Sequence, residues 1–250
     1  MNGSARHAGR PPAAASCLAA CALLIGAAVA GAAPRPVSFA TEDGVTIAAT
    51  LYEASSRPAP AVVLLHMLGR SRDDWRAVAD RLAGAGIHAL AIDFRGHGGS
   101  TLGTPAEGGG PDLARMALDV RAAVGFLASR PDLVDRSRIG IGGASLGANV
   151  AIAAAAADET IRSVALLSPS LDYRSLRADA PMRKYGARPA LLAAATDDPY
   201  AMRSVHALAG LGGGTREIRT SETAGHGTRM LEHDGDLARA LVDWFLRTLI

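Results

Sequence analysis

Apolar runs and helical periodicities alternate along the chain from residue 61 to its end. The apolar runs have the length of buried strands and occupy residues 61–67, 87–94, 138–143, 163–168 and 189–196, and a shorter β-prone stretch follows at 215–220. Between them, apolar residues recur at helical spacing over 75–84, 112–130, 146–157, 201–208 and 230–249. This alternation predicts an α/β fold, with a mostly parallel central sheet covered by helices on both faces.

An antiparallel hairpin is expected before this alternating region. Two β-prone stretches, VSFAT at 37–41 and VTIAATLYE at 45–53, flank an Asp-Gly pair at Asp43 and Gly44. Such a pair between two strands favours a tight turn. The segment 168–188 offers room for an insertion over the sheet edge, but it is too short for a large lid domain. We therefore expect one domain over residues 34–250.

Composition and charge narrow the classes of partner. The chain is 49% hydrophobic but only 4% aromatic, so its core must consist mainly of aliphatic side chains. It carries 26 basic and 24 acidic residues, a formal charge of +2. This balance gives no electrostatic reason to expect nucleic acid or an acidic membrane surface as a partner. A small-molecule substrate is the expected partner, and the oligomeric state is not indicated.

The first 33 residues resemble an export signal. Arg6 and Arg10 precede an apolar stretch at 13–30, and small residues follow at 31–33, where cleavage after Ala32 or Ala33 fits. We therefore expect a periplasmic or secreted protein. Two alternatives stay open: an uncleaved membrane anchor, and a lipoprotein acylated at Cys21. Cleavage would remove both cysteines of the chain, and with them any disulfide, thiol chemistry or cysteine metal site.

One serine stands where a buried strand gives way to an alanine-rich helix. Ser145 lies in the stretch GASLG between Gly143 and Gly147, a G-x-S-x-G pattern in a strand–turn–helix context. Small flanking residues permit a sharp turn that holds the hydroxyl clear of the sheet. The helix that begins at Leu146 supplies free backbone N–H groups next to it. We interpret Ser145 as a nucleophile; a plain helix-capping serine is the alternative.

A serine hydroxyl needs a base, and the base needs a carboxylate to orient it. His226 lies between two glycines after the last predicted strand, where a loop can reach over the sheet edge. Asp198 follows the strand at 189–196 and is the favoured carboxylate, with Asp197 as the alternative; one of the two is expected to cap the next helix. The remaining histidines of the domain are expected to be structural or solvated: His66, His88, His97, His206 and His233.

Four segments together resemble the α/β-hydrolase superfamily, over essentially all of residues 36–250. They are the loop HMLG at 66–69, the segment DFRGHGGS at 93–100, the turn around Ser145 and the stretch GHG at 225–227, and they occur in the order of that family. The order of serine, carboxylate and histidine also matches the chain order of the family's catalytic triad.

The resemblance further implies an oxyanion hole formed by the backbone N–H groups of Met67 and Leu146. Glycine is common in the family where this chain has Met67, so we expect the methionine side chain to narrow or line the acyl pocket. The resemblance implies a serine hydrolase similar to small esterases and dienelactone hydrolases, which would cleave a carboxylic ester through an acyl-enzyme on Ser145. A peptidase, amidase or thioesterase on the same triad, or a non-catalytic binding protein on the same fold, remains an alternative. No metal or organic cofactor is implied.

Overall fold

The computed structural model describes residues 1–3, 32–107, 109–222 and 225–250. Most of the predicted export segment, including Cys21, therefore lies outside the described residues. Within the described ranges, none of the helices has the length and apolar character needed to span a membrane.

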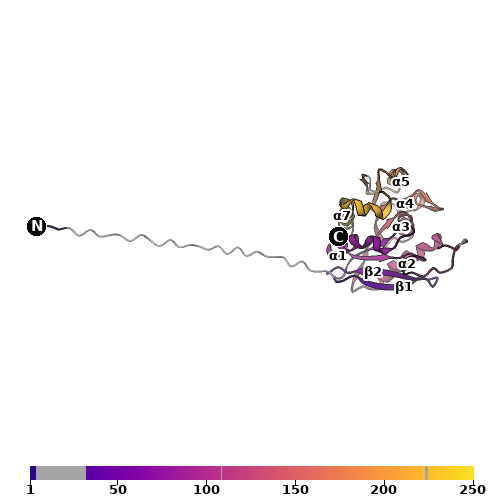
Figure 1. The fold of residues 1–250 in the computed structure, drawn as a ribbon, viewed down its shortest axis with the longest axis horizontal. Helices are drawn as coiled ribbons and strands as arrows, with labels where there is room; N and C mark the ends of the chain where they lie inside the picture. The colour runs from indigo at the N-terminus through magenta and orange to yellow at the C-terminus, as the bar shows by residue number, and fades with distance from the viewer. Residues whose placement is uncertain (4–31, 108, 223–224) are drawn as a thin grey trace.

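One eight-stranded sheet organises the chain (Figure 1). Its order is β1-β2-β4-β3-β5-β6-β9-β10. The strands are β1 (Arg35–Ala40), β2 (Thr46–Tyr52), β3 (Ala59–Leu65), β4 (His88–Ile92), β5 (Val134–Ala144), β6 (Ile161–Leu167), β9 (Ala190–Ala195) and β10 (Arg216–Ser221). β1 pairs with β2, and β2 with β4, in antiparallel fashion, while all later pairs are parallel. The predicted fold class and the N-terminal hairpin are confirmed.

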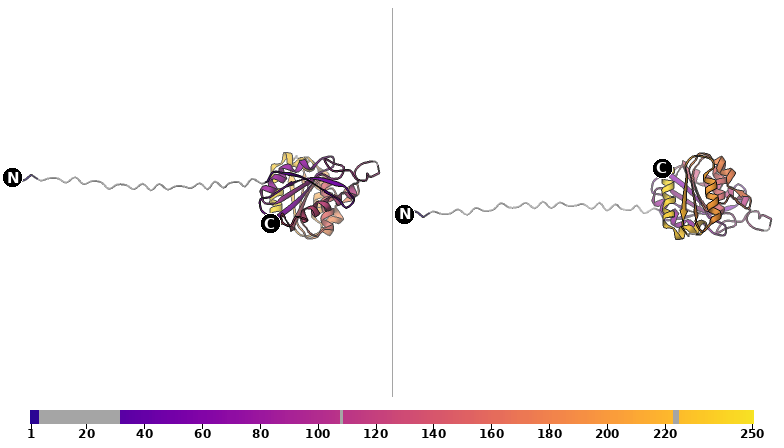
Figure 2. Two further views of the ribbon diagram at one scale, coloured as in Figure 1. Left: turned by 90° about the horizontal axis from the view of Figure 1, so that it is seen from below. Right: turned by 90° about the horizontal axis from the view of Figure 1, so that it is seen from above.

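Helices cover both faces of the sheet, as the apolar strands predicted (Figure 2). Two buried clusters fill the spaces between the layers. One joins the sheet to α2 (Met116–Ala128), α3 (Leu146–Ala157), α4 (Asp179–Tyr185) and α5 (Pro199–Ala209). The other joins it to α1 (Arg76–Gly84) and α7 (Gly235–Leu249). A strand buried on both faces cannot alternate polar and apolar residues, which explains runs such as APAVVLL in β3.

α3 is the most deeply buried helix segment of this arrangement. Its sequence LGANVAIAAAAA has almost no polar face, and nearly every residue from Leu146 to Ala156 is buried. The helix packs on β5 and β6 from one side and against α2 and α4 from the others. A helix that is apolar all round is stable only when it is enclosed in this way. Its small alanine side chains let these neighbours approach closely, so the start of α3 is firmly seated.

The structure corrects one predicted element. We expected a single last helix over 230–249, but the chain forms a short α6 (Met230–His233) and then α7. The break is at Asp234, whose extended backbone (φ −125°, ψ 92°) interrupts the helix. Its carboxylate accepts hydrogen bonds from the N–H groups of Asp236 at 3.0 Å and Leu237 at 2.9 Å. Asp234 is therefore the N-cap of α7. Apolar periodicity continued across this residue, so the pattern alone did not reveal the cap.

The segment 168–188 forms a small hairpin and a helix over the sheet edge. β7 (Asp172–Tyr173) and β8 (Leu176–Arg177) pair with each other, and α4 follows. Asn149 of α3 holds the hairpin in place, because its side-chain amide donates to the carbonyls of Ser170 at 2.9 Å and Leu176 at 2.7 Å. Its oxygen accepts from the Ser170 N–H at 3.0 Å. As expected from its length, this segment is no lid domain.

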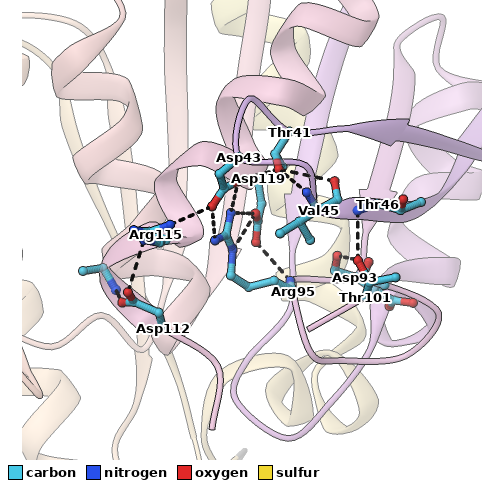
Figure 3. Close-up of polar contacts among 12 residues, drawn as sticks. Thr41, Asp43, Val45, Thr46, Asp93, Arg95, Thr101, Asp112, Arg115 and Asp119 are labelled. Atoms are coloured by element: carbon cyan, nitrogen blue, oxygen red, sulfur yellow. Dashed lines mark hydrogen bonds and ion pairs between the residues drawn. The ribbon is translucent and has the colours of Figure 1, made fainter. Parts of the chain in front are cut away.

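A buried ion-pair network ties the N-terminal hairpin to the helical layer (Figure 3). Arg95 follows β4 and is fully buried. Its guanidinium donates to Asp119 of α2 at 2.7 and 2.9 Å, and to Asp43 of the β1–β2 turn at 2.8 Å. The hydrogen bonds from Arg95 hold the pKa of the Asp43 carboxyl below its ordinary value. Arg115 also reaches Asp43, at 3.3 Å, but from the surface.

Replacing Arg95 with Met should destabilise the fold strongly, because it leaves the buried Asp119 carboxylate without its counter-charge. We expect the free energy of unfolding, measured by urea titration, to fall by about 3–5 kcal/mol. Arg115→Met is the control, because Arg115 shares only Asp43 with Arg95, and its exposed ion pair should contribute less than about 1 kcal/mol. Equal losses in the two variants would contradict the importance of the buried pair.

Candidate active site

The carboxyl ends of neighbouring strands bring the predicted site residues to one edge of the sheet. In the register of the parallel pairs, Leu65 of β3 lies beside Gly143 of β5, and Ala144 lies beside Leu167 of β6. The loops that leave these ends carry Met67, Ser145 and Ser168, and the loops after β9 and β10 carry Asp198 and His226. In an open parallel sheet this edge is where ligands bind.

Ser145 occupies the sharp turn between β5 and α3. Its backbone has φ 51° and ψ −115°, a conformation that a non-glycine residue rarely adopts. The two glycines of the pattern are required by close packing around it. A Cβ at Gly143 would lie 2.3 Å from the carbonyl oxygen of Gly147, and a Cβ at Gly147 would lie 2.5 Å from that of Leu65. Neither position has room for any side chain.

Three side chains form a hydrogen-bonded row above this turn. The Nε2 atom of His226 lies 2.7 Å from the Ser145 Oγ, and its Nδ1 atom lies 2.5 Å from the Asp198 Oδ2. A carboxylate can only accept, so Nδ1 carries the proton and Nε2 is free to accept the serine proton. The structure therefore brings together the serine, histidine and aspartate that the sequence singled out, in the tautomer that a general base requires.

Asp198 has two roles at once, because it faces the histidine and is also the aspartate of the pair that caps the next helix. Its Oδ2 faces His226, while its Oδ1 accepts the N–H of Ala201 at 3.1 Å and so caps α5. Its neighbour Asp197 instead accepts the Gly225 N–H at 3.2 Å. The cap fixes the Asp198 carboxylate relative to a rigid helix, and its other oxygen is held in position for the imidazole. The favoured choice of Asp198 over Asp197 agrees with this geometry.

The predicted oxyanion donors lie next to the serine. Leu146 is the first residue of α3, and the peptide group that carries the Met67 N–H packs against the same turn: a Cβ at Gly147 would lie 2.6 Å from the His66 carbonyl oxygen. Neither N–H donates a hydrogen bond to any of the residues that the structure describes. The Leu146 N–H lies at the N-terminus of α3, where negative charge is favoured, and the Met67 N–H belongs to the loop after β3. The Met67 thioether also lies against Gly227, a contact that the sequence did not predict.

Two histidines near the site have structural contacts. His66 is fully buried; its Nε2 accepts the Phe94 N–H at 3.0 Å, and its Nδ1 therefore donates to the Met67 carbonyl, 2.8 Å away. Burial lowers the pKa of His66 to about 4, so the ring is neutral at pH 7 and fixes the loop that carries the Met67 N–H. The ring of His97 lies 3.0 Å from the Arg95 carbonyl. The expectation that these histidines organise loops agrees with their contacts.

Asp93 is another buried group, and it connects the loops after β3 and β4. Its carboxylate accepts the N–H groups of Arg72 at 2.7 Å and Gly99 at 2.8 Å, and it pairs with the Arg72 guanidinium. Its backbone carbonyl accepts the Ser100 hydroxyl at 2.7 Å. All these contacts are internal to the loops, so the DFRGHGGS segment holds the loop after β4 in shape.

Sequence reasoning missed several residues around the histidine loop. Ser168 accepts the Gly227 N–H at 2.9 Å, and Thr228 donates to Asp74 at 2.5 Å. Ser168 ends a strand directly beside β5, and its place at the carboxyl end of the sheet could have marked it.

The described residues include no cluster of three or more histidine, cysteine or acidic side chains suited to a metal ion.

One family of known proteins matches most of the chain. A family model described as "Serine aminopeptidase, S33" matches residues 56–204, more than half of the chain. An uncharacterized protein of Mycobacterium tuberculosis is 36% identical over 121 residues, which are 48% of this chain and 40% of that protein. A thiohydrolase of Arthrinium phaeospermum is 32% identical over 156 residues, 60% of this chain and 47% of that protein. The chain thus spans less than half the length of these curated relatives.

Solved structures agree on the fold. A dienelactone hydrolase of Anabaena variabilis superposes with a TM-score of 0.68 at 22% identity and covers 87% of this chain and 99% of its own. An esterase of Pyrococcus furiosus superposes with a TM-score of 0.71 at 20% identity and covers 87% of this chain and 91% of its own. At identities of 22% and 20%, these superpositions show that the chain shares the fold of the two proteins.

The two adjacent aspartates allow a matched test of the row. Asp198→Asn keeps an oxygen that can cap α5 but removes the carboxylate from His226 Nδ1. We expect the kcat for p-nitrophenyl acetate to fall about 10³–10⁴-fold, because the imidazole loses its useful tautomer. Asp197→Asn retains an acceptor for Gly225 and should cost less than about 10-fold. A larger loss in Asp197→Asn than in Asp198→Asn would contradict the assignment.

Proposed function

The chain belongs to the serine aminopeptidase S33 family of α/β hydrolases, and from this premise we propose that it hydrolyses carboxylic esters through an acyl-enzyme on Ser145. The observation that carries the proposal is the row Ser145–His226–Asp198, with hydrogen bonds of 2.7 and 2.5 Å. A serine whose hydroxyl faces an imidazole, itself oriented by a carboxylate, is an activated nucleophile.

The proposed reaction has two stages. The Ser145 Oγ attacks the ester carbonyl while His226 Nε2 takes its proton, and the carbonyl oxygen gains negative charge. The N–H groups of Met67 and Leu146 stabilise this oxyanion, each by about 3 kcal/mol. The tetrahedral intermediate expels the alcohol, which receives the proton from His226. Water then attacks the acyl-enzyme, with His226 as its base, and the acid leaves from Ser145.

The charges beside the row favour an ester over a peptide with a free amino terminus. An aminopeptidase must recognise the α-ammonium group of its substrate, which calls for an available carboxylate near the serine. Among the described residues near the row, Asp74 pairs with Arg70 and accepts from Thr228, and Asp198 faces His226. Of the N–H groups that the structure describes, the exposed Asp197 accepts only that of Gly225. Glu232 pairs with Arg70. A neutral ester needs no such group.

A thioester is the second candidate substrate. One relative, 32% identical over 156 residues, is named a thiohydrolase. The chemistry at Ser145 would be the same, with a thiolate in place of the alkoxide as leaving group. Turnover of p-nitrophenyl acetate, an acyl thioester and an amino-acid p-nitroanilide, compared on one preparation, separates the ester, thioester and aminopeptidase assignments.

Replacing Ser145 with Ala tests the nucleophile. We expect the kcat for p-nitrophenyl acetate to fall at least about 10⁴-fold, because the remaining site has no group to form the acyl-enzyme. The control is Ser137→Ala, the same substitution at the exposed, opposite end of β5, and its activity should be unchanged. Both variants should keep the wild-type circular dichroism spectrum.

Covalent labelling separates an enzyme from a binding protein on the same fold. A fluorophosphonate should modify the wild type at Ser145 and should not modify Ser145→Ala. Undiminished ester turnover in Ser145→Ala, or an unreactive wild type, would overturn the proposed mechanism.

We also propose that the domain acts outside the cytoplasm, as the N-terminal sequence pattern indicates. Mass spectrometry of the protein recovered from the cell envelope or medium should give a mature chain that begins at Ala33 or Pro34. A chain that begins at an acylated Cys21 would identify a lipoprotein. A chain that still carries residues 1–33 would show that the segment is not cleaved.

A further inference from the structure

Four consecutive residues of the loop that carries His226 are each anchored to a different part of the sheet edge. Gly225 is held by Asp197, His226 by Asp198 and Ser145, Gly227 by Ser168, and Thr228 by Asp74. We propose that Ser168 and Thr228 are positioning residues that keep the His226 imidazole within reach of the nucleophile. This inference rests on the proposed function of the row.

The loop needs anchors because, among the residues that the structure describes, little besides Ser145 and Asp198 holds the imidazole. The His226 side chain is 40% exposed, so packing against the core does not fix it. Glycines flank it on both sides, at φ 77° for Gly225 and 63° for Gly227. Glycine gives the backbone the freedom to make this turn, and the same freedom lets the loop adopt other conformations. Hydrogen bonds to rigid elements remove that freedom.

Ser168 supplies the first anchor, at the residue directly after the histidine. It is fully buried at the end of β6, and its own N–H is bonded to the Ala193 carbonyl at 2.7 Å. Its hydroxyl accepts the Gly227 N–H at 2.9 Å and donates toward the Met230 Sδ at 3.9 Å. The hydroxyl thus contacts both the loop and the first residue of α6. Its backbone has φ 47°, so the residue is held in an uncommon conformation that points to a specific role.

Thr228 supplies the second anchor and links the histidine loop to the loop after β3. It is buried, and its hydroxyl donates to Asp74 at 2.5 Å. Asp74 is in turn held by the Arg70 guanidinium at 2.8 Å. The backbone N–H of Arg70 donates to the Met67 carbonyl at 3.2 Å. The histidine loop and the loop with the predicted oxyanion donor are therefore fixed relative to each other.

The test compares hydroxyl deletions at the anchors with matched deletions elsewhere on the same kinds of element. Ser168→Ala is paired with Ser163→Ala, a buried serine at the far end of the same strand whose hydroxyl binds Thr248 at 2.8 Å. Ser168→Gly is a second variant, because glycine accepts the positive φ without strain. Thr228→Val is paired with Thr248→Val on α7, and Thr228→Ser should restore the hydroxyl contact.

We expect Ser168→Ala, Ser168→Gly and Thr228→Val each to lower the kcat for p-nitrophenyl acetate about 10–100-fold, with KM changed less than about 3-fold, because the base is misplaced while the substrate surface is intact. The rate of fluorophosphonate labelling should fall in parallel. Thr228→Ser and both control variants should stay within about 3-fold of wild type. A general loss of stability would affect Ser163→Ala as much as Ser168→Ala and would not be reversed by the conservative variant.

Amide hydrogen exchange at Gly227 separates failure of this inference from failure of the proposed function. Exchange at this amide should be faster in Ser168→Ala than in the wild type or Ser163→Ala. If Ser145→Ala is inactive but Ser168→Ala and Thr228→Val match their controls, the positioning role is wrong and ester hydrolysis stands. If Ser145→Ala remains active, the proposed function is wrong. In that case, unchanged exchange at Gly227 in Ser168→Ala would also overturn the anchor.

Discussion

The turn at Ser145 is the constraint on which the site depends. Its positive φ directs the chain from β5 into α3 within one residue, and the start of α3 packs so tightly against the end of β3 that Gly147 touches the backbone carbonyls of Leu65 and His66. This contact places the first free N–H groups of the helix beside the serine and beside the Met67 peptide. The enclosure of α3 on all sides stabilises a conformation that would be strained in isolation.

Around this fixed point the polar groups are organised in two tiers. The deeper tier consists of buried groups whose contacts are internal, such as the Arg95–Asp119 pair, Asp93 and the neutral His66. It shapes the loops after β3 and β4. The upper tier consists of Asp198, His226 and Ser145, whose hydrogen bonds run from a helix cap to the serine hydroxyl. A buried polar group must have its partners within the protein, so the deeper tier is rigid, while the half-exposed imidazole needs separate anchors.

The S33 membership and the fold support the proposed hydrolase activity, and the proposed ester chemistry draws on details of this chain. Asp198 both caps α5 and orients His226, so the stability of the start of α5 and the alignment of the imidazole depend on one carboxylate. Thr228, Asp74 and Arg70 link the base to the loop that carries the predicted oxyanion donor. Residues with no reacting atom therefore contribute to the relative placement of the reacting groups, and accurate placement lowers the barrier of acyl transfer.

The sequence by itself indicated the alternation of strands and helices, the two-faced burial of the sheet and the turn at Ser145. It also singled out Ser145 and His226 and favoured Asp198 over Asp197. These features follow from local periodicity and from short motifs such as G-x-S-x-G, and such information is present in a short stretch of chain. Tertiary structure decided the rest. It made Asp198 both the cap and the partner of His226, placed the Met67 thioether against Gly227, divided the last helix at Asp234 and set Ser168 and Thr228 beside the histidine loop. Each of these features depends on hydrogen bonds or contacts between separate segments, most of which lie far apart in the sequence. The geometry of such contacts is fixed only when the segments pack together, and no periodic pattern in the sequence encodes the distances between them.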